Sequence, residues 1–84
     1  MKYCMITFRS VTFAQRGDGL LRRAGFECSL QRTPRWMEEQ GCGYSLRLRR
    51  ADAMAAVQLL QEGGIAYRKI YSNGQNGAME ELFL

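Results

Sequence analysis

Hydrophobic and polar residues alternate along several short stretches of the chain, a period of two that is typical of β-strands with one buried face. Lys2–Arg9, Phe26–Thr33 and Tyr44–Arg49 each show this alternation, and they are rich in residues that favour strands. Pro34 ends the second stretch because proline has no backbone N–H for a ladder. Ile65–Tyr71 is predicted to be a fourth strand.

Two other stretches carry apolar residues at helical spacing. The first begins after Ser10, a plausible N-cap, and ends at Gly25, a typical residue just beyond a helix C-terminus. The second ends at Gly63 and Gly64. Its predicted buried stripe consists of Ala53, Ala56, Val57 and Leu60.

The resulting order is β-α-β-β-α-β. Right-handed crossovers fold this order into an α+β, ferredoxin-like sandwich, in which a four-stranded antiparallel sheet carries two helices on one face. We expect residues 1–71 to form this single domain. Residues 72–84 are expected to be a flexible turn followed by a short apolar C-terminal appendage.

Composition limits the classes of function that the chain can serve. It has 84 residues, of which 46% are hydrophobic and 24% charged, and its apolar runs are too short to cross a membrane. Residues 1–8 are interpreted as a strand and not as a signal peptide. The absence of histidine excludes a histidine-relayed nucleophile and an imidazole metal site within the chain.

Cysteine usage adds to these limits. The chain has three cysteines and no Cys-x-x-Cys pair, which argues against a disulfide framework and a zinc site. We therefore expect no bound metal and a reducing, cytoplasmic location, without membrane contact.

The three cysteines are predicted to have different surroundings. Cys4 and Cys28 share strand faces with apolar residues, so we expect both to face the helices as small hydrophobes with raised pKa values. Cys42 lies between Gly41 and Gly43, where a loop meets a strand, and no neighbouring side chain shields its sulfur. Two interpretations are open: a reactive thiolate, or a tight turn in which Cys42 fills a small gap.

Cationic and aromatic residues surround Cys42 in the sequence. Arg35, Arg47 and Arg32 are candidates to lower its pKa if they converge in space. Trp36 is a candidate docking residue for a partner protein or a lid over the sulfur, with core anchoring as the alternative. Arg47 and Arg49 are further candidates for partner docking.

An ordered set of residues between positions 2 and 71 resembles a known bacterial family, the DUF3343 or selenium/sulfur (Se/S) carrier protein-like family. The matching features are the opening strand Tyr3–Phe8, Ser10, Ala14, Ala24-Gly25, Thr33-Pro34-Arg35, Cys42-Gly43, Leu46 and Ile70-Tyr71. The loop before Cys42 is about one residue longer than the family's usual spacing. It carries Met37–Gln40 where the family commonly has a serine, and the carboxylates of Glu38 and Glu39 would oppose a thiolate if they folded inward.

The resemblance implies a non-enzymatic carrier that holds sulfur or selenium on Cys42 as a persulfide or selenopersulfide. Arg35, next to Pro34, would stabilise the anionic sulfur, and Gly41 and Gly43 would leave the thiol accessible. The implied partners are a donor such as a cysteine desulfurase and an acceptor protein. No cofactor is implied apart from the transient sulfur or selenium atom.

The same residues are compatible with two other functions. An open sheet face with Tyr3, Met5, Arg47 and Arg49, together with Tyr67, Lys69 and Tyr71, would suit RNA binding. However, Tyr44–Arg49 has no aromatic residue at the exposed stacking positions, so nucleic acid is not the expected partner.

A protein-interaction module is the other alternative. The apolar end Leu82–Leu84 would then be an interface, as in a homodimer, or it would fold back on its own domain. Enzymatic activity is not expected, because the chain has no phosphate-binding loop, cofactor fingerprint or fixed pair of carboxylates.

Overall fold

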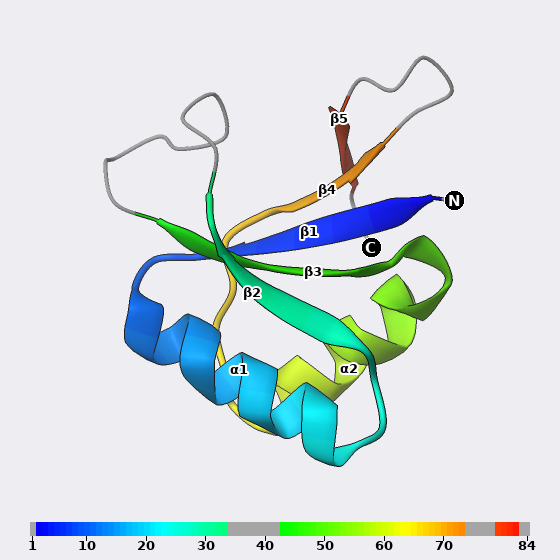
Figure 1. Ribbon diagram of the computed structural model, residues 1–84. Helices are drawn as coiled ribbons and strands as arrows, with labels where there is room; N and C mark the ends of the chain where they lie inside the picture. The colour runs from blue at the N-terminus through cyan, green and yellow to red at the C-terminus, as the bar shows by residue number, and fades with distance from the viewer. Residues whose placement is uncertain (1, 34–42, 74–78, 83–84) are drawn as a thin grey trace.

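The computed structural model describes residues 2–33, 43–73 and 79–82. These residues form two α-helices, one short 3-10 helix and a five-stranded antiparallel sheet (Figure 1). The elements are β1 (Tyr3–Phe8), α1 (Val11–Arg23), β2 (Cys28–Arg32), β3 (Tyr44–Arg49), η2 (Arg50–Asp52), α2 (Ala53–Glu62), β4 (Ile70–Asn73) and β5 (Met79–Leu82).

The N-terminal strand lies in the middle of the sheet. The strands follow the order β2-β3-β1-β4-β5, and β1 is antiparallel to both of its neighbours, with Cys4 opposite Leu48 on one side and Ser72 on the other. The predicted succession β-α-β-β-α-β is therefore present.

The predicted count of four strands was wrong, because β5 adds a fifth to the free edge of β4. The pairing places Ile70 opposite Leu82 and Tyr71 opposite Glu81. An unpaired edge exposes a row of backbone N–H and C=O groups, and β5 satisfies those of β4. The sheet thus continues beyond residue 71.

Two strands are shorter than their sequence patterns suggested. β4 begins at Ile70, and before it Ile65 and Tyr67 pack on the hydrophobic core without joining the ladder. The prediction that Tyr67 belongs to the open sheet face was therefore wrong. β2 begins at Cys28 because the backbone N–H of Phe26 donates to Leu21 at the end of α1 (3.0 Å).

The helix boundaries agree with the capping residues in the sequence. Ser10 caps α1 by accepting a hydrogen bond from the backbone N–H of Phe13 (3.3 Å), and Gly25 follows the helix with a φ of 94°. Gly64 follows α2 with a φ of 71°. The four predicted core positions of α2 are all buried: Ala53, Ala56, Val57 and Leu60.

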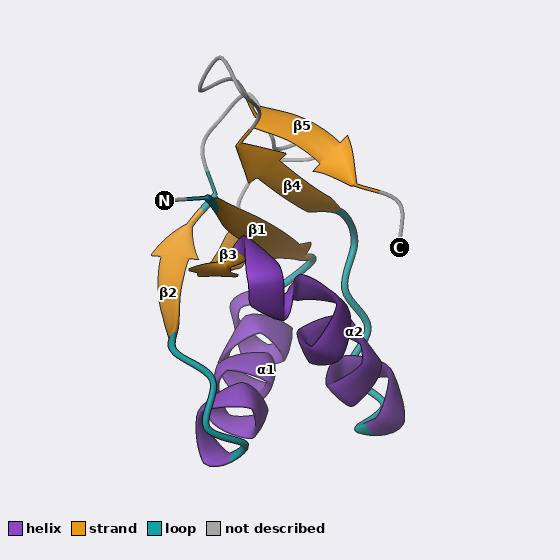
Figure 2. Cartoon of the chain, turned by 90° about the vertical axis from the view of Figure 1, so that its right-hand side faces the viewer, coloured by secondary structure: helices purple, strands orange, loops and turns teal. Residues whose placement is uncertain are grey.

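Both helices cover the same face of the sheet, as Figures 1 and 2 show from two directions. The core between the layers includes Ile6 and Phe8 from β1, Leu46 from β3 and Leu60 from α2. α1 approaches the sheet closely at Gly17. A Cβ at this position would lie only 3.2 Å from Phe8 and Leu60 and 3.3 Å from Leu46. None of the described helices is long and apolar enough to cross a membrane.

Candidate functional site

The part of the chain that the structure describes resumes at Gly43, the residue directly after the candidate thiol Cys42. Cys42 lies outside the described residues, as do Gly41, Pro34, Arg35 and Trp36. Gly43, which follows Cys42 in the chain, is held by a hydrogen bond from the backbone N–H of Thr33 to its carbonyl oxygen (3.0 Å). This bond continues the β2–β3 ladder by one residue pair, so both ends of the connecting loop are fixed to the sheet.

Two buried hydroxyl groups flank Gly43 without a hydrogen-bond partner among the described residues. Ser45 is 0% exposed and Thr33 is 5% exposed, yet neither Ser45 Oγ nor Thr33 Oγ1 is paired there. The register places both side chains on the sheet face away from the helices, together with Thr7. Thr7 differs, because its Oγ1 donates to the Lys69 carbonyl (3.2 Å) and accepts from the Lys69 N–H (3.0 Å).

An unpaired buried hydroxyl costs about 1–3 kcal/mol of desolvation, so an acceptor at this place would be stabilised. Thr33 was noted only within the Thr33-Pro34-Arg35 match, and Ser45 was not predicted to be a site residue. The period of two assigns each to a strand face, but it does not show which hydroxyl groups find a partner.

Basic residues gather at the same end of the sheet as Gly43. Arg32 ends β2, and Arg9 follows Phe8, whose register partner is Tyr44. Arg68 and Lys69 join from the segment before β4, where the Arg68 N–H donates to the Thr7 carbonyl (2.7 Å). Lys69 Nζ lies 3.8 Å from Glu81 on β5. Basic side chains at one end of a sheet favour an anion there, and Glu81 offsets part of this charge.

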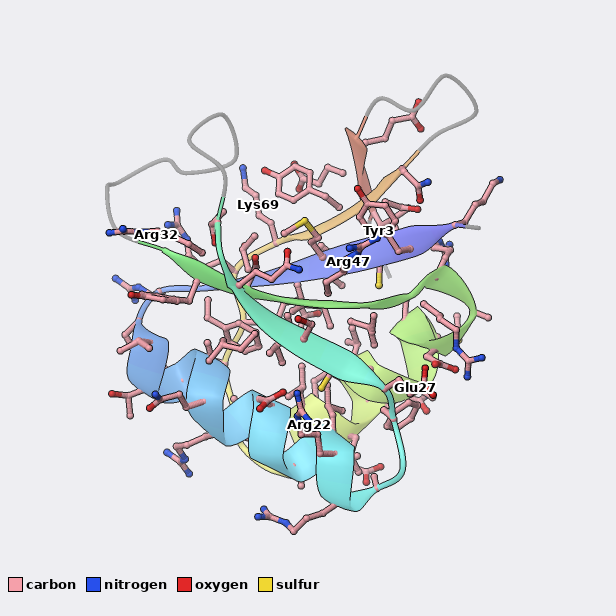
Figure 3. The ribbon with its side chains drawn as sticks, in the orientation of Figure 1. Tyr3, Arg22, Glu27, Arg32, Arg47 and Lys69 are labelled. Carbon is pink, nitrogen blue, oxygen red and sulfur yellow. The ribbon has the colours of Figure 1, made fainter. Side chains whose placement is uncertain are left out.

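Arg47 and Arg49, the predicted docking residues, are further along β3. Arg47 is four residues from Gly43, roughly 13 Å at about 3.3 Å per residue. Its guanidinium lies over the ring of Tyr3, with Cζ 4.1 Å from the ring centroid. Arg49 pairs with Asp52 (3.3 Å). Figure 3 shows Tyr3 and Arg47 together, away from Arg32.

Cys4 is in the core, as its strand pattern predicted. The side chain is 0% exposed, and burial raises the pKa of its thiol from 9.0 to about 11. Arg50 lowers this pKa and Asp52 raises it, but both effects are smaller than that of burial. Cys4 is therefore a neutral thiol at physiological pH.

Cys28 also faces α1, as its strand pattern predicted, but it is only partly buried. Its Sγ donates to Asp18 Oδ1 (3.1 Å), and the same carboxylate oxygen accepts a bond from Arg22 Nε (2.9 Å). Burial, followed by the hydrogen bond and charge of Asp18, raises the pKa of Cys28 to about 11. Burial and Asp18 together thus favour the protonated thiol of Cys28.

The described residues contain no group of three or more cysteine, aspartate or glutamate side chains that would hold a metal ion. Gly17-Asp18-Gly19 lies within α1, so it does not form a phosphate-binding loop.

Comparison with known proteins matches the chain to a family model. The model of the family described as "Putative Se/S carrier protein-like" matches residues 3–72. Neither the curated proteins nor the solved structures gave a match. The matched segment includes Cys42, Thr33, Ser45 and all elements from β1 to α2. Because the match covers most of its length, the chain belongs to the Se/S carrier protein-like family.

Proposed function

We propose that the protein is a non-enzymatic carrier that holds a sulfur or selenium atom on the Sγ of Cys42 and passes it to an acceptor protein. The observation that carries this proposal is the state of the other two thiols. Cys4 is buried and Cys28 is bonded to Asp18, and both have pKa values of about 11, so neither is a good nucleophile near neutral pH. Membership in the Se/S carrier protein-like family supports the same conclusion.

The transfer needs no oxidant or cofactor. The thiolate of Cys42 attacks the outer sulfur of a persulfide on a donor, such as a cysteine desulfurase. The new S–S bond forms as the donor's S–S bond breaks, and the donor cysteine leaves as a thiolate. An acceptor thiolate then attacks the outer sulfur, and Cys42 is released. A selenium atom would be transferred in the same way.

The surroundings of Gly43 suit the anion that this chemistry produces. A persulfide at Cys42 would be an acceptor for the unpaired hydroxyl groups of Thr33 and Ser45 if its sulfur turned to the sheet face that carries them. These hydroxyls would take the role of the serine that the preceding loop lacks. Arg9 and Arg32 at the same end of the sheet would add favourable charge, together with Arg35 in the loop.

Peptide-resolved mass spectrometry after incubation with cysteine and a cysteine desulfurase tests the proposal. We expect a mass increase of one sulfur atom on the Cys42 peptide, which is lost in Cys42→Ser. Ser45→Ala should shorten the lifetime of the persulfide without loss of thermal stability, because the removed hydroxyl has no partner among the described residues.

Ser72→Ala is the matched control for Ser45→Ala. The Ser72 hydroxyl is on the helix side of the sheet and already donates to the Tyr3 carbonyl (3.4 Å), so the persulfide lifetime should not change. Sulfur confined to Cys4 or Cys28 would contradict the carrier function. An equal loss of lifetime in both serine variants would remove the role of Ser45.

We also infer that the scaffold is a ferredoxin-like sandwich extended by one strand. The β-α-β-β-α-β order, the strand order β2-β3-β1-β4 and the placement of both helices on one face support this inference. β5 is then an addition at the edge of β4.

A further inference from the structure

A pocket of about 290 Å³ opens on the sheet face away from the helices, at the opposite end from Gly43. Tyr3, Arg47, Arg49 and Ser29 line it together with Glu27. Tyr3 and Arg47 come from β1 and β3, two adjacent strands within the sheet. Arg47 and Arg49 are exposed and Tyr3 is half-buried at this end, whereas Met5, Thr7 and Ser45 on the same face are buried.

The stacked pair of Tyr3 and Arg47 is the central feature of this pocket. The guanidinium of Arg47 covers the tyrosine ring at 4.1 Å, while the residue as a whole is exposed. Among the described residues, Arg47 has no acidic partner, in contrast to Arg22 and Arg49, which pair with Asp18 and Asp52. The charge of Arg47 is therefore available to a ligand, and one face of its planar group is already supported by the ring.

Further cations surround the pair. Arg49 is two residues along the same face of β3, and Lys2 precedes Tyr3 at the start of β1. The backbone N–H of Arg50 donates to the Lys2 carbonyl (3.2 Å), which keeps a fourth basic residue at this end. Asp52 offsets part of this charge. With a net charge of +4 for the chain, the region suits a ligand that carries phosphates.

This arrangement supplies what the sequence of β3 lacks for nucleic-acid binding. Bases that are splayed out of a single strand stack on aromatic rings and also on arginine guanidinium planes. β3 has no aromatic residue at its exposed positions, and Arg47 occupies one of them. The ring of Tyr3 supports one face of the Arg47 guanidinium. The pair therefore offers a stacking surface on two adjacent strands of the sheet.

We propose that this face of the sheet binds single-stranded nucleic acid, with one base stacked on the Arg47–Tyr3 pair and the flanking phosphates held by Arg49 and Lys2. Glu27 at the rim of the pocket accepts hydrogen bonds from base amino groups. The binding is a second activity, separate from sulfur transfer, because none of these residues belongs to the Cys42 site.

Fluorescence anisotropy with short labelled oligonucleotides at low and moderate salt tests the proposal. Arg47→Ala and Tyr3→Leu should each weaken binding by about tenfold or more, in line with the usual loss for a stacked base. Arg47→Lys keeps the charge but removes the planar group, so it should also weaken binding. Arg16→Ala is the control, because it removes the same charge from the exposed surface of α1 and should change affinity by less than about twofold.

The outcomes separate stacking from general attraction between charges. Equal losses in Arg16→Ala and Arg47→Ala, or full activity in Arg47→Lys and Tyr3→Leu, would overturn the proposal. No binding of RNA or DNA oligonucleotides at low salt would also overturn it. An acidic peptide that competes as well as the oligonucleotide would identify a protein surface instead.

Two further measurements test whether the ligand is a strand and not a single nucleotide, and whether the site acts independently of Cys42. A free mononucleotide should bind much more weakly than an oligonucleotide, because it lacks the flanking phosphates; equal affinity would contradict the strand-binding arrangement. Cys42→Ser should bind oligonucleotides normally, so failure of sulfur loading and failure of nucleic-acid binding are distinguishable. Circular dichroism of each variant confirms that a loss is not due to unfolding.

Discussion

Brief alkylation of the native protein near neutral pH should modify the three cysteines in a defined order. The thiolate is the reactive form of cysteine, and a rise in pKa from 9.0 to about 11 lowers its population at Cys28 about 100-fold. A thiolate of higher pKa is also intrinsically more nucleophilic. With a Brønsted coefficient of about 0.4–0.5, the rise in pKa increases the reaction rate of the Cys28 thiolate itself by roughly tenfold, which offsets part of the loss in population. Cys28 should therefore react about tenfold more slowly in the folded protein than in the denatured chain.

Cys4 should be protected far more strongly than Cys28. Its side chain is 0% exposed and lies in the central strand, so a reagent reaches it only when the sheet opens. An opening free energy of about 5 kcal/mol or more would slow its reaction by at least roughly 10³-fold. Cys42 should be modified first.

Iodoacetamide labelling for increasing times, followed by peptide-resolved mass spectrometry, measures the three rates in one sample. The same protein in guanidinium chloride provides the reference, because all three thiols are then exposed. Modification of Cys4 or Cys28 before Cys42 would refute the assignment of the reactive thiol. A folded-state rate for Cys28 equal to its denatured rate would refute the raised pKa of its thiol.

Three other predictions concern the forces within the fold. Asp18→Asn removes the charge that raises the pKa of Cys28, so alkylation of Cys28 should accelerate, whereas Asp52→Asn should leave that rate unchanged. Gly17→Leu should lower the free energy of unfolding, measured by urea denaturation, by about 1–3 kcal/mol through overpacking. Gly19→Ala should raise it by up to about 1 kcal/mol, because the added Cβ would meet only Arg23 at 3.7 Å. Equal effects of both variants would contradict the close approach at residue 17. The contribution of the Cys4 thiol to the free energy of unfolding is fully present below pH 9 and is lost between pH 9 and about 11, because the thiol of the unfolded chain ionises first. Over that range the free energy of unfolding of the wild type should fall by about 2–3 kcal/mol more than that of Cys4→Ala. Parallel pH profiles of the two proteins would disprove this prediction.

The sequence patterns predicted the elements whose formation depends on local spacing. The buried stripe of α2 follows from a period of 3.6, and the position of Cys4 follows from the alternation along β1. The cap at Ser10 was also identifiable, because capping depends on one residue and its neighbours.

Features that depend on pairing between distant segments could not be predicted in this way. β5 is a short segment after a glycine-rich stretch, and its strand conformation depends on the free edge of β4. The unpaired hydroxyls of Thr33 and Ser45 depend on the register of three strands, and the stacking of Arg47 on Tyr3 depends on the side chains that two strands bring together. Single-sequence patterns contain no information about such contacts.

The hydrogen bond from Thr33 to Gly43 has a consequence for how the family can diversify. It closes the chain at the point where the β2–β3 ladder ends, so the strands do not depend on the nine residues between them for their pairing. Doubling the length of a connection closed in this way costs only about 0.6 kcal/mol of chain entropy. A loop with one extra residue is therefore easily tolerated, and the segment that carries the proposed carrier thiol can change in length and composition while the sheet stays the same.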